Sequence, residues 1–150
     1  MIAYARRLAL LLVAGIALAQ DAAAESVADT LSRWGLIGTW SVDCTRSAST
    51  SNGHLTYIAV GGGKVMHERD FGDRRDANEV QQASTGIGGA LDIIVHFPTL
   101  GQTRKYTLLM GVDGRVRAMS NSRVDGTAAT IRDGKFTEGG GPTPWQMRCR

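Results

Sequence analysis

The sequence lacks an apolar run long enough to cross a bilayer. Its longest uninterrupted run, residues 8–19, has twelve residues, whereas a membrane-spanning helix needs about 20. No cysteine follows directly after this run, which excludes a bacterial lipoprotein anchor. We therefore expect a protein without a membrane anchor.

The apolar run has the surroundings of an export signal. Arg6 and Arg7 precede it, and small residues that a signal peptidase accepts close it. This pattern predicts a signal peptide over residues 1–19, with an alternative cut after residue 24, and one exported domain over residues 20–150. The expected location is the periplasm or the extracellular medium.

A strong excess of charge of one sign is also missing. The whole chain has a formal charge of +3, and removal of Arg6 and Arg7 leaves the exported part at +1, with acidic and basic residues interspersed. A nucleic-acid-binding surface needs a one-sided basic field. The sequence therefore predicts no nucleic-acid partner.

Catalytic motifs are absent. There is no G-x-S-x-G elbow for a serine nucleophile. The run Gly-Gly-Gly-Lys at 61–64 lacks the Ser or Thr of a phosphate-binding loop and predicts a hairpin turn. Four carboxylates are candidates for acid–base chemistry, but nothing in the sequence brings two together: Asp43, Glu68, Asp70 and Asp92. We expect a non-enzymatic protein without a cofactor.

The three histidines, His54, His67 and His96, lie on three different predicted strands. No two of them have the i, i+2 spacing that would place both imidazoles on one face of a strand. The sequence therefore predicts isolated surface or rim histidines and no metal site.

Cys44 and Cys149 are the only cysteines. Two thiols in an oxidising compartment most often form one disulfide, here between an early strand and the end of the chain. A redox or metal-binding pair is the alternative, but the spacing is not C-x-x-C and no histidine lies at ligand spacing beside either cysteine. We expect a structural disulfide.

Glycine is abundant, with 19 of 150 residues, nearly twice the usual share of roughly 7%. The glycines punctuate segments in which apolar residues alternate with a period of two, after one short helix over 27–34 that Ser26 caps and Gly35 ends. About eight strands are predicted, at 37–44, 54–60, 64–71, 79–85, 91–97, 103–112, 115–122 and 144–149, with a charged turn around 73–78. The fold class is all-β, a single antiparallel barrel or closed sandwich with one short N-terminal helix, and a disulfide between its first and last strands favours closure.

The sequence Gly38-Thr39-Trp40 opens the first predicted strand, directly behind the helix. It resembles the G-x-W signature of the calycin barrels, the lipocalins and fatty-acid-binding proteins. The segments 36–44 and 143–149 are similar to small exported proteins of proteobacteria. The resemblance implies that Trp40 closes one end of a barrel and that an arginine of the last strand packs across it. Arg148 or Arg150 is the candidate for this cation–π contact. The residues assigned to this end of the barrel are Gly38, Trp40, Trp145 and Arg148.

The resulting functional hypothesis is a binding module, expected to be a monomer, that holds a small apolar ligand in or at the mouth of the barrel. Its predicted wall residues are Trp34, Tyr57, Phe97, Tyr106, Leu108 and Met110. The alternative is a protein-interaction module, an inhibitor or an envelope partner, that uses its loops and has a filled core. Interior volume separates the two, because ligand pockets begin at about 300 Å³.

Overall fold

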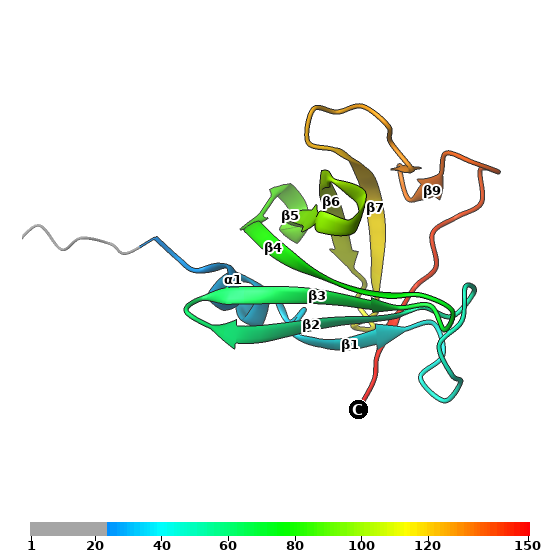
Figure 1. Ribbon diagram of the computed structural model, residues 1–150, viewed down its shortest axis with the longest axis horizontal. Coiled ribbons are helices and arrows are strands. Elements are labelled where there is room, and N and C mark those ends of the chain that lie inside the picture. Colours follow the sequence, from blue (N-terminus) through cyan, green and yellow to red (C-terminus); the bar gives the residue numbers. More distant parts are fainter. Residues whose placement is uncertain (1–23) are drawn as a thin grey trace, which may run out of the picture.

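The computed structural model describes residues 24–150, which form one antiparallel sheet of ten strands and one α-helix (Figure 1). Helix α1 (Val27–Trp34) comes first. The strands are β1 (Gly38–Ser41), β2 (His54–Gly61), β3 (Lys64–Asp70), β4 (Arg75–Thr85), β5 (Leu91–Phe97), β6 (Gln102–Met110), β7 (Val116–Arg123), β8 (Ile131–Arg132), β9 (Lys135–Phe136) and β10 (Met147–Arg148). Short 3₁₀ turns, η1 (Ile87–Gly89) and η2 (Pro98–Leu100), flank β5. The predicted signal peptide, residues 1–19, lies outside the described residues. Within residues 24–150 no helix is long and apolar enough to span a membrane.

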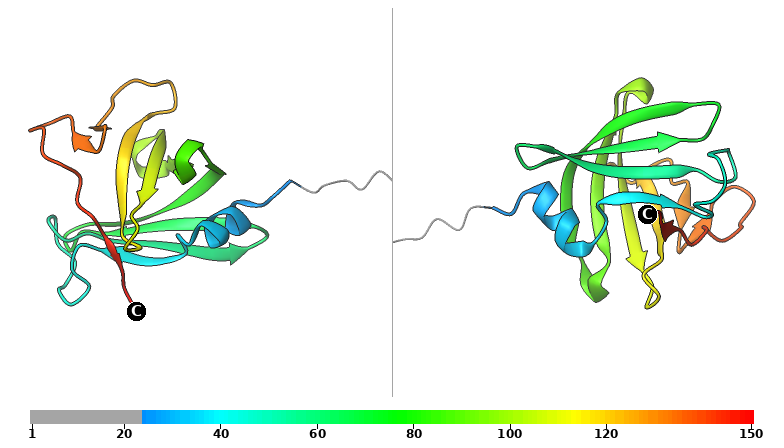
Figure 2. Two further views of the ribbon diagram at one scale, coloured as in Figure 1. Left: turned by 180° about the vertical axis from the view of Figure 1, so that it is seen from behind. Right: turned by 90° about the horizontal axis from the view of Figure 1, so that it is seen from below.

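The predicted all-β, antiparallel fold with one short N-terminal helix is confirmed. The sheet is a half-barrel, however, so the prediction that about eight strands close into a barrel or sandwich is wrong. Its order is β10-β1-β2-β3-β4-β5-β6-β7-β8-β9, so β9 and β10 are its two edge strands and do not pair with each other (Figure 2). The chain between β7 and β10 contains five glycines, four of which have φ between +67° and +81°, and it builds only the two-residue strands β8 and β9. One isolated pair, Val116 with Gln146, connects β7 to the segment that precedes β10.

Strand β4 is longer than the sequence predicts. It begins at Arg75, inside the segment expected to be a charged turn, because its charged residues pair across the ladder. Asp76 lies opposite Arg69 of β3, and Arg75 lies opposite Asp70. Charges that look like solvated turn residues in the sequence are thus cross-strand ion pairs of a regular hairpin.

The concave face of the sheet carries the core. Strand β5 alternates strictly, and its inward side chains Leu91, Ile93, Val95 and Phe97 are at most 1% exposed. Helix α1 packs on β3 and β4 and covers one end of the half-barrel, where Leu31 is completely buried (Figures 1 and 2). One face of one sheet therefore supplies nearly all of the apolar interior.

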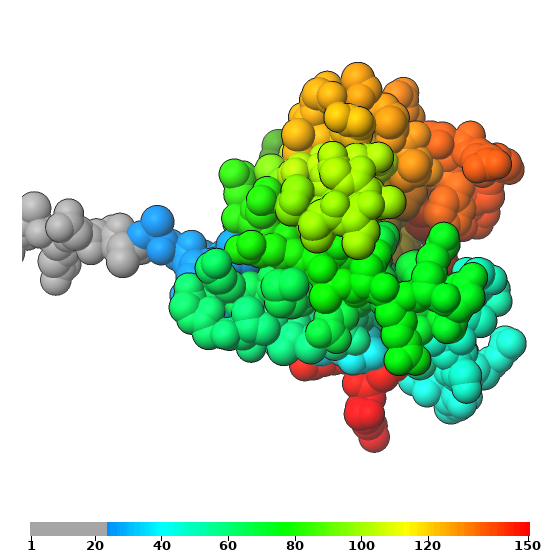
Figure 3. Space-filling model, in the orientation of Figure 1, coloured from blue at the N-terminus to red at the C-terminus, as the bar shows by residue number. Residues whose placement is uncertain are grey.

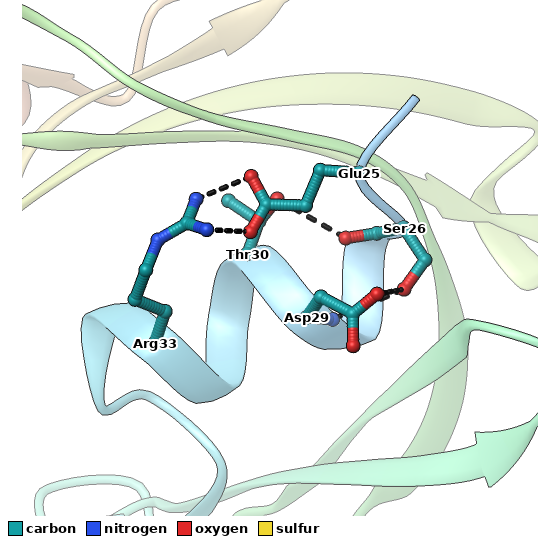
Figure 4. A network of polar contacts seen from close by, with 5 residues as sticks. All are labelled: Glu25, Ser26, Asp29, Thr30 and Arg33. Carbon is teal, nitrogen blue, oxygen red and sulfur yellow. Dashed lines mark hydrogen bonds and ion pairs between the residues drawn. The ribbon is translucent and has the colours of Figure 1, made fainter. Parts of the chain in front are cut away.

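Helix α1 has polar caps at both ends. At its start the Ser26 hydroxyl accepts a hydrogen bond from the Asp29 N–H at 3.1 Å, and Arg33 pairs with Glu25 (Figure 4). At its end Gly35, with φ +92°, donates to the Leu31 and Ser32 carbonyls, and the Leu36 N–H also reaches the Leu31 carbonyl. This is a Schellman motif, and it explains why the predicted helix bounds are confirmed.

The helix is attached to the β2–β3 turn at Gly63. The Ala28 N–H donates to the Gly63 carbonyl at 3.0 Å, and a Cβ at Gly63 would lie 2.7 Å from the Ser26 Cβ. Gly63 also has φ +75°, whereas its neighbour Gly62 has φ +60° with nothing within 4 Å of a Cβ. Gly62 therefore needs glycine only for its backbone conformation, and Gly63 needs it also for contact with the helix.

We predict that Gly63→Ala destabilises the protein more than Gly62→Ala does. The left-handed backbone costs either alanine about 1–2 kcal/mol, and only Gly63→Ala also displaces α1. Urea unfolding of the two variants and the wild type measures both effects. Equal losses of unfolding free energy would mean that the contact between helix and turn contributes nothing.

The predicted disulfide between Cys44 and Cys149 is confirmed, with the two Cα atoms 5.4 Å apart. It lies beside the β1–β10 ladder, in which Trp40 pairs with Arg148, and the Cys149 N–H donates to the Thr39 carbonyl at 2.8 Å. The bond therefore joins two strands that are already neighbours rather than the two edges of the sheet. For this reason it does not close the barrel.

Replacement of both cysteines, Cys44→Ser with Cys149→Ser, should lower the unfolding free energy by about 2–5 kcal/mol. The bond spans 105 residues of sequence, and long loops gain most from a cross-link in the chain-entropy model. Thermal unfolding with and without dithiothreitol measures the effect. The reductant should lower the melting temperature of the wild type and leave that of the double variant unchanged. A wild type whose melting temperature does not change would show that the disulfide does not stabilise the protein.

Candidate functional site

The concave side of the half-barrel is not filled by its own side chains. A cavity of about 260 Å³ lies between the sheet and the segments that cross its open side. Most of its wall is apolar and comes from four strands, the α1–β1 connection and β8: Leu36, Trp40, Leu55, Leu108, Val116 and Ile131. This volume is slightly below the 300 Å³ at which pockets for drug-sized ligands begin, so the cavity fits a smaller ligand.

Polar side chains also line this wall, and four of them lie on strands β2, β3 and β6. Tyr57 comes from β2, His67 and Arg69 from β3, and Tyr106 from β6. Tyr57 lies opposite His67 in the β2–β3 ladder, and their rings stack at 4.4 Å with an angle of 15°. Arg69 and Tyr106 are close enough to act on the pKa of Tyr57. We call these four residues the polar cluster.

Arg69 is the cation of the polar cluster, and Asp76 of β4 neutralises it. The Arg69 Nε donates to Asp76 Oδ1 at 2.8 Å, and Nη2 donates to Oδ2. The arginine hydrogen bond lowers the pKa of Asp76. The Arg69 guanidinium also stacks on Phe97 at 4.4 Å. Each of the two side chains is only about one-fifth exposed, so this bidentate pair is shielded from solvent.

His67 is an uncharged imidazole inside the protein. It is 3% exposed, and burial, aided by the charge of Arg69, lowers its pKa to about 3. Its Nδ1 has no hydrogen-bond partner among the described residues, and neither does Oδ1 of Asn78, the residue opposite it on β4. Two buried polar atoms without partners at one place are uncommon in folded proteins.

The two phenols of the cluster are also uncharged. Burial raises the pKa of Tyr57 and of Tyr106 above the ordinary value for tyrosine, against a smaller opposing effect of Arg69. Both hydroxyls therefore stay protonated at physiological pH and can donate hydrogen bonds. The polar cluster together with Asp76 has no net charge.

The open side of the cavity is covered by two irregular segments. One is the loop 45–53, held by the buried amide of Asn52, which accepts from the Ser41 hydroxyl at 3.0 Å and the Asp43 N–H at 2.9 Å. The other is the chain after β7, which forms the orange region of the surface (Figure 3). Arg104 of β6 holds this second segment through the Ala128 carbonyl at 2.8 Å.

The structure separates the six predicted wall residues into two groups. Tyr57, Tyr106 and Leu108 line the cavity. The other three lie elsewhere, for identifiable reasons. Phe97 is fully buried beneath Arg69, Met110 packs near Gly35 at the end of the core, and Trp34 donates to the Gly89 carbonyl at 2.8 Å.

The residues assigned to the end of the barrel also differ in their surroundings. Trp40 is 2% exposed, lines the cavity, and donates to the Leu36 carbonyl at 2.7 Å. Arg148 packs against Gly38, which has no side chain there, and donates to the Ile37 carbonyl at 2.7 Å. The cation–π contact at this end, within the described residues, is instead that of Arg117 with Trp145, at 5.2 Å.

The carboxylates weighed for acid–base chemistry lie apart from the cavity wall, and three of them have local partners. Asp43 accepts from Thr45, Asp70 from the Gly72 N–H and Asp92 from Thr107. Across residues 24–150 no three His, Cys, Asp or Glu side chains are arranged to hold a metal ion.

Sequence reasoning missed the inward half of β3. It placed His67 at the surface or rim and gave Arg69 no role, whereas both lie on the concave side. The available signal was the spacing of two residues along Val65, His67, Arg69 and Phe71. The first and last of these residues are apolar and should face inward, so the two residues between them should lie on the same face of the strand.

Comparisons with protein families, curated proteins and solved structures found no match. The relationship to the calycins therefore stays a prediction from the G-x-W motif.

Buried His67 should make stability depend on pH. Its pKa is about 3 in the folded protein and about 6.5 in the unfolded chain. Between these values the unfolded chain binds a proton that the folded protein does not, so stability falls as pH decreases below 6.5. Lowering the pH from 7 to 5 should cost about 2 kcal/mol through this group.

Denaturant unfolding at pH 7 and pH 5 measures this cost, with His67→Phe as the comparison. Phenylalanine keeps a ring stacked on Tyr57 and cannot bind a proton. The loss of unfolding free energy between the two pH values should therefore be smaller in the variant. The same loss in both proteins would show that His67 is not buried in its neutral form.

Proposed function

We propose that this protein is an exported, non-enzymatic binding module that holds one small ligand with a mostly apolar body in the cavity of its half-barrel. The observation that carries the proposal is the cavity of about 260 Å³, with apolar walls and a few converging polar groups. Ligand sites generally have this composition, in which apolar contacts supply affinity and a few polar groups supply orientation.

The size of the cavity supports a ligand rather than a packing defect. Small β-barrels are either filled by their own side chains or hold one small ligand. Engineered cavities of about 150 Å³ with apolar walls bind benzene or xenon, and the cavity here is larger. Trp40 and Leu108, both at most 6% exposed, contribute side chains to its wall without filling it.

Export is part of the proposal. The Cys44–Cys149 disulfide is typical of proteins that fold in an oxidising compartment, and residues 1–19 have the pattern of a secretory signal. We place the protein in the periplasm or outside the cell on these two grounds.

The alternative function is binding of a protein partner through the loops. The observation in its favour is a set of exposed apolar side chains, among them Ile87, Leu100 and Val112, which are 101%, 54% and 112% exposed. Each lies in a different turn: η1, η2 and the β6–β7 connection. Side chains scattered singly need no partner to explain them, so the cavity is the stronger basis for function.

Filling the cavity should abolish binding. We predict that protein purified from its own oxidising compartment carries a non-protein ligand in native mass spectra, and that Ala118→Phe, in the cavity wall, removes it. Ala77→Phe, the same change at an exposed position of β4, should retain it. A bare chain in the wild type, or equal ligand mass in both variants, contradicts the proposal.

A further inference from the structure

We propose, on the basis of the binding function above, that the cavity selects a neutral ligand that carries a hydroxyl group on its apolar body and rejects the carboxylate of the same shape. The polar cluster, made of Tyr57, His67, Arg69 and Tyr106, is the part of the wall that makes this choice. The charge of the site, its hydrogen-bonding capacity and its size each favour such a ligand.

The charge of the site is already balanced. Arg69 is the one fully charged side chain in the cavity wall formed by the described residues, and both of its bonds to Asp76 lie within the protein. Asp76 is also held by the Asn78 amide at 2.7 Å. A ligand carboxylate would be a second anion beside Asp76 in a partly buried site, where like charges repel strongly.

The hydrogen-bonding capacity of the cluster is not used up. His67 lines the cavity, and its neutral imidazole has one N–H and one lone pair. The Tyr57 and Tyr106 hydroxyls add donors, and their raised pKa values keep them protonated. A ligand hydroxyl both donates and accepts and can match such a mixed set, whereas a carboxylate only accepts.

The size of the cavity limits the apolar body. A volume of about 260 Å³ corresponds to about nine water molecules at roughly 30 Å³ each. A ligand of about ten non-hydrogen atoms fits this space. Naphthalene and its derivatives have this size and offer matched members with no polar group, with a hydroxyl and with a carboxylate.

The test compares naphthalene, 2-naphthol and 2-naphthoate at pH 7 by isothermal titration and by chemical shifts of the cavity residues. We expect 2-naphthol to bind about tenfold more tightly than naphthalene, because it forms one more hydrogen bond. It should also bind about tenfold more tightly than 2-naphthoate, because it brings no second negative charge into the site. His67→Phe should reduce the advantage of naphthol over naphthalene to about twofold or less.

The variant Asp76→Asn removes the negative charge that balances Arg69. It leaves Arg69 without its anion, so the affinity for 2-naphthoate should rise about tenfold relative to 2-naphthol. Glu68→Gln is the matched control, because it removes the same charge from the exposed face of β3 and should leave the ranking of the three probes unchanged.

The outcomes separate this proposal from the one it rests on. Wild-type protein that binds 2-naphthoate as tightly as 2-naphthol, or naphthalene as tightly as 2-naphthol, overturns the selectivity and leaves the binding function standing. Failure of the wild type to bind any of the three probes contradicts the binding function itself. The wild-type ranking decides the question even if Asp76→Asn does not fold.

Discussion

The structure depends on the attachment of its last strand to its first. β10 pairs with β1, the Cys44–Cys149 disulfide lies beside that ladder, and Arg148 bonds back to the Ile37 carbonyl. The chain just before β10 is thereby held across the open side of the half-barrel, where Gln146 pairs with Val116 of β7. Without this attachment the concave face would be an open apolar surface. With it, the same face becomes the wall of a cavity.

The interior that this attachment encloses is unusual for a small β-domain because it is partly polar and yet carries no net charge. Arg69 would be costly to bury alone, and Asp76 removes that cost by a bidentate bond from the neighbouring strand. His67 stays neutral mainly because burial lowers its pKa, and the positive charge of Arg69 adds to this effect while Asp76 opposes it. The electrostatics of the site therefore follow from one cross-strand register on β3 and β4.

The sequence alone predicts the helix and the hairpin correctly. It does not predict that the sheet stays open, nor that His67 and Arg69 face the cavity. Caps and turns are local, so the helix Val27–Trp34 and the hairpin at Gly61–Gly63 were predicted from neighbouring residues alone. Closure depends on whether the chain between β7 and β10 can form a long strand, and its glycine turns prevent this. His67 and Arg69 were missed because charged and polar side chains on an alternating strand are normally solvated; only the partner strands show that they face inward.

A cavity and unpartnered polar atoms both lower the stability of a folded protein. Here they occur together, since His67 lines the cavity and its Nδ1, like Asn78 Oδ1 opposite, has no partner among the described residues. A core shaped by stability alone would fill the space with apolar side chains, as β5 does two strands away from His67 in the sheet. The long-range disulfide offsets part of the loss by restricting the unfolded chain. The polar cavity is therefore a cost to the stability of this fold, and a bound ligand of the kind proposed above would offset it.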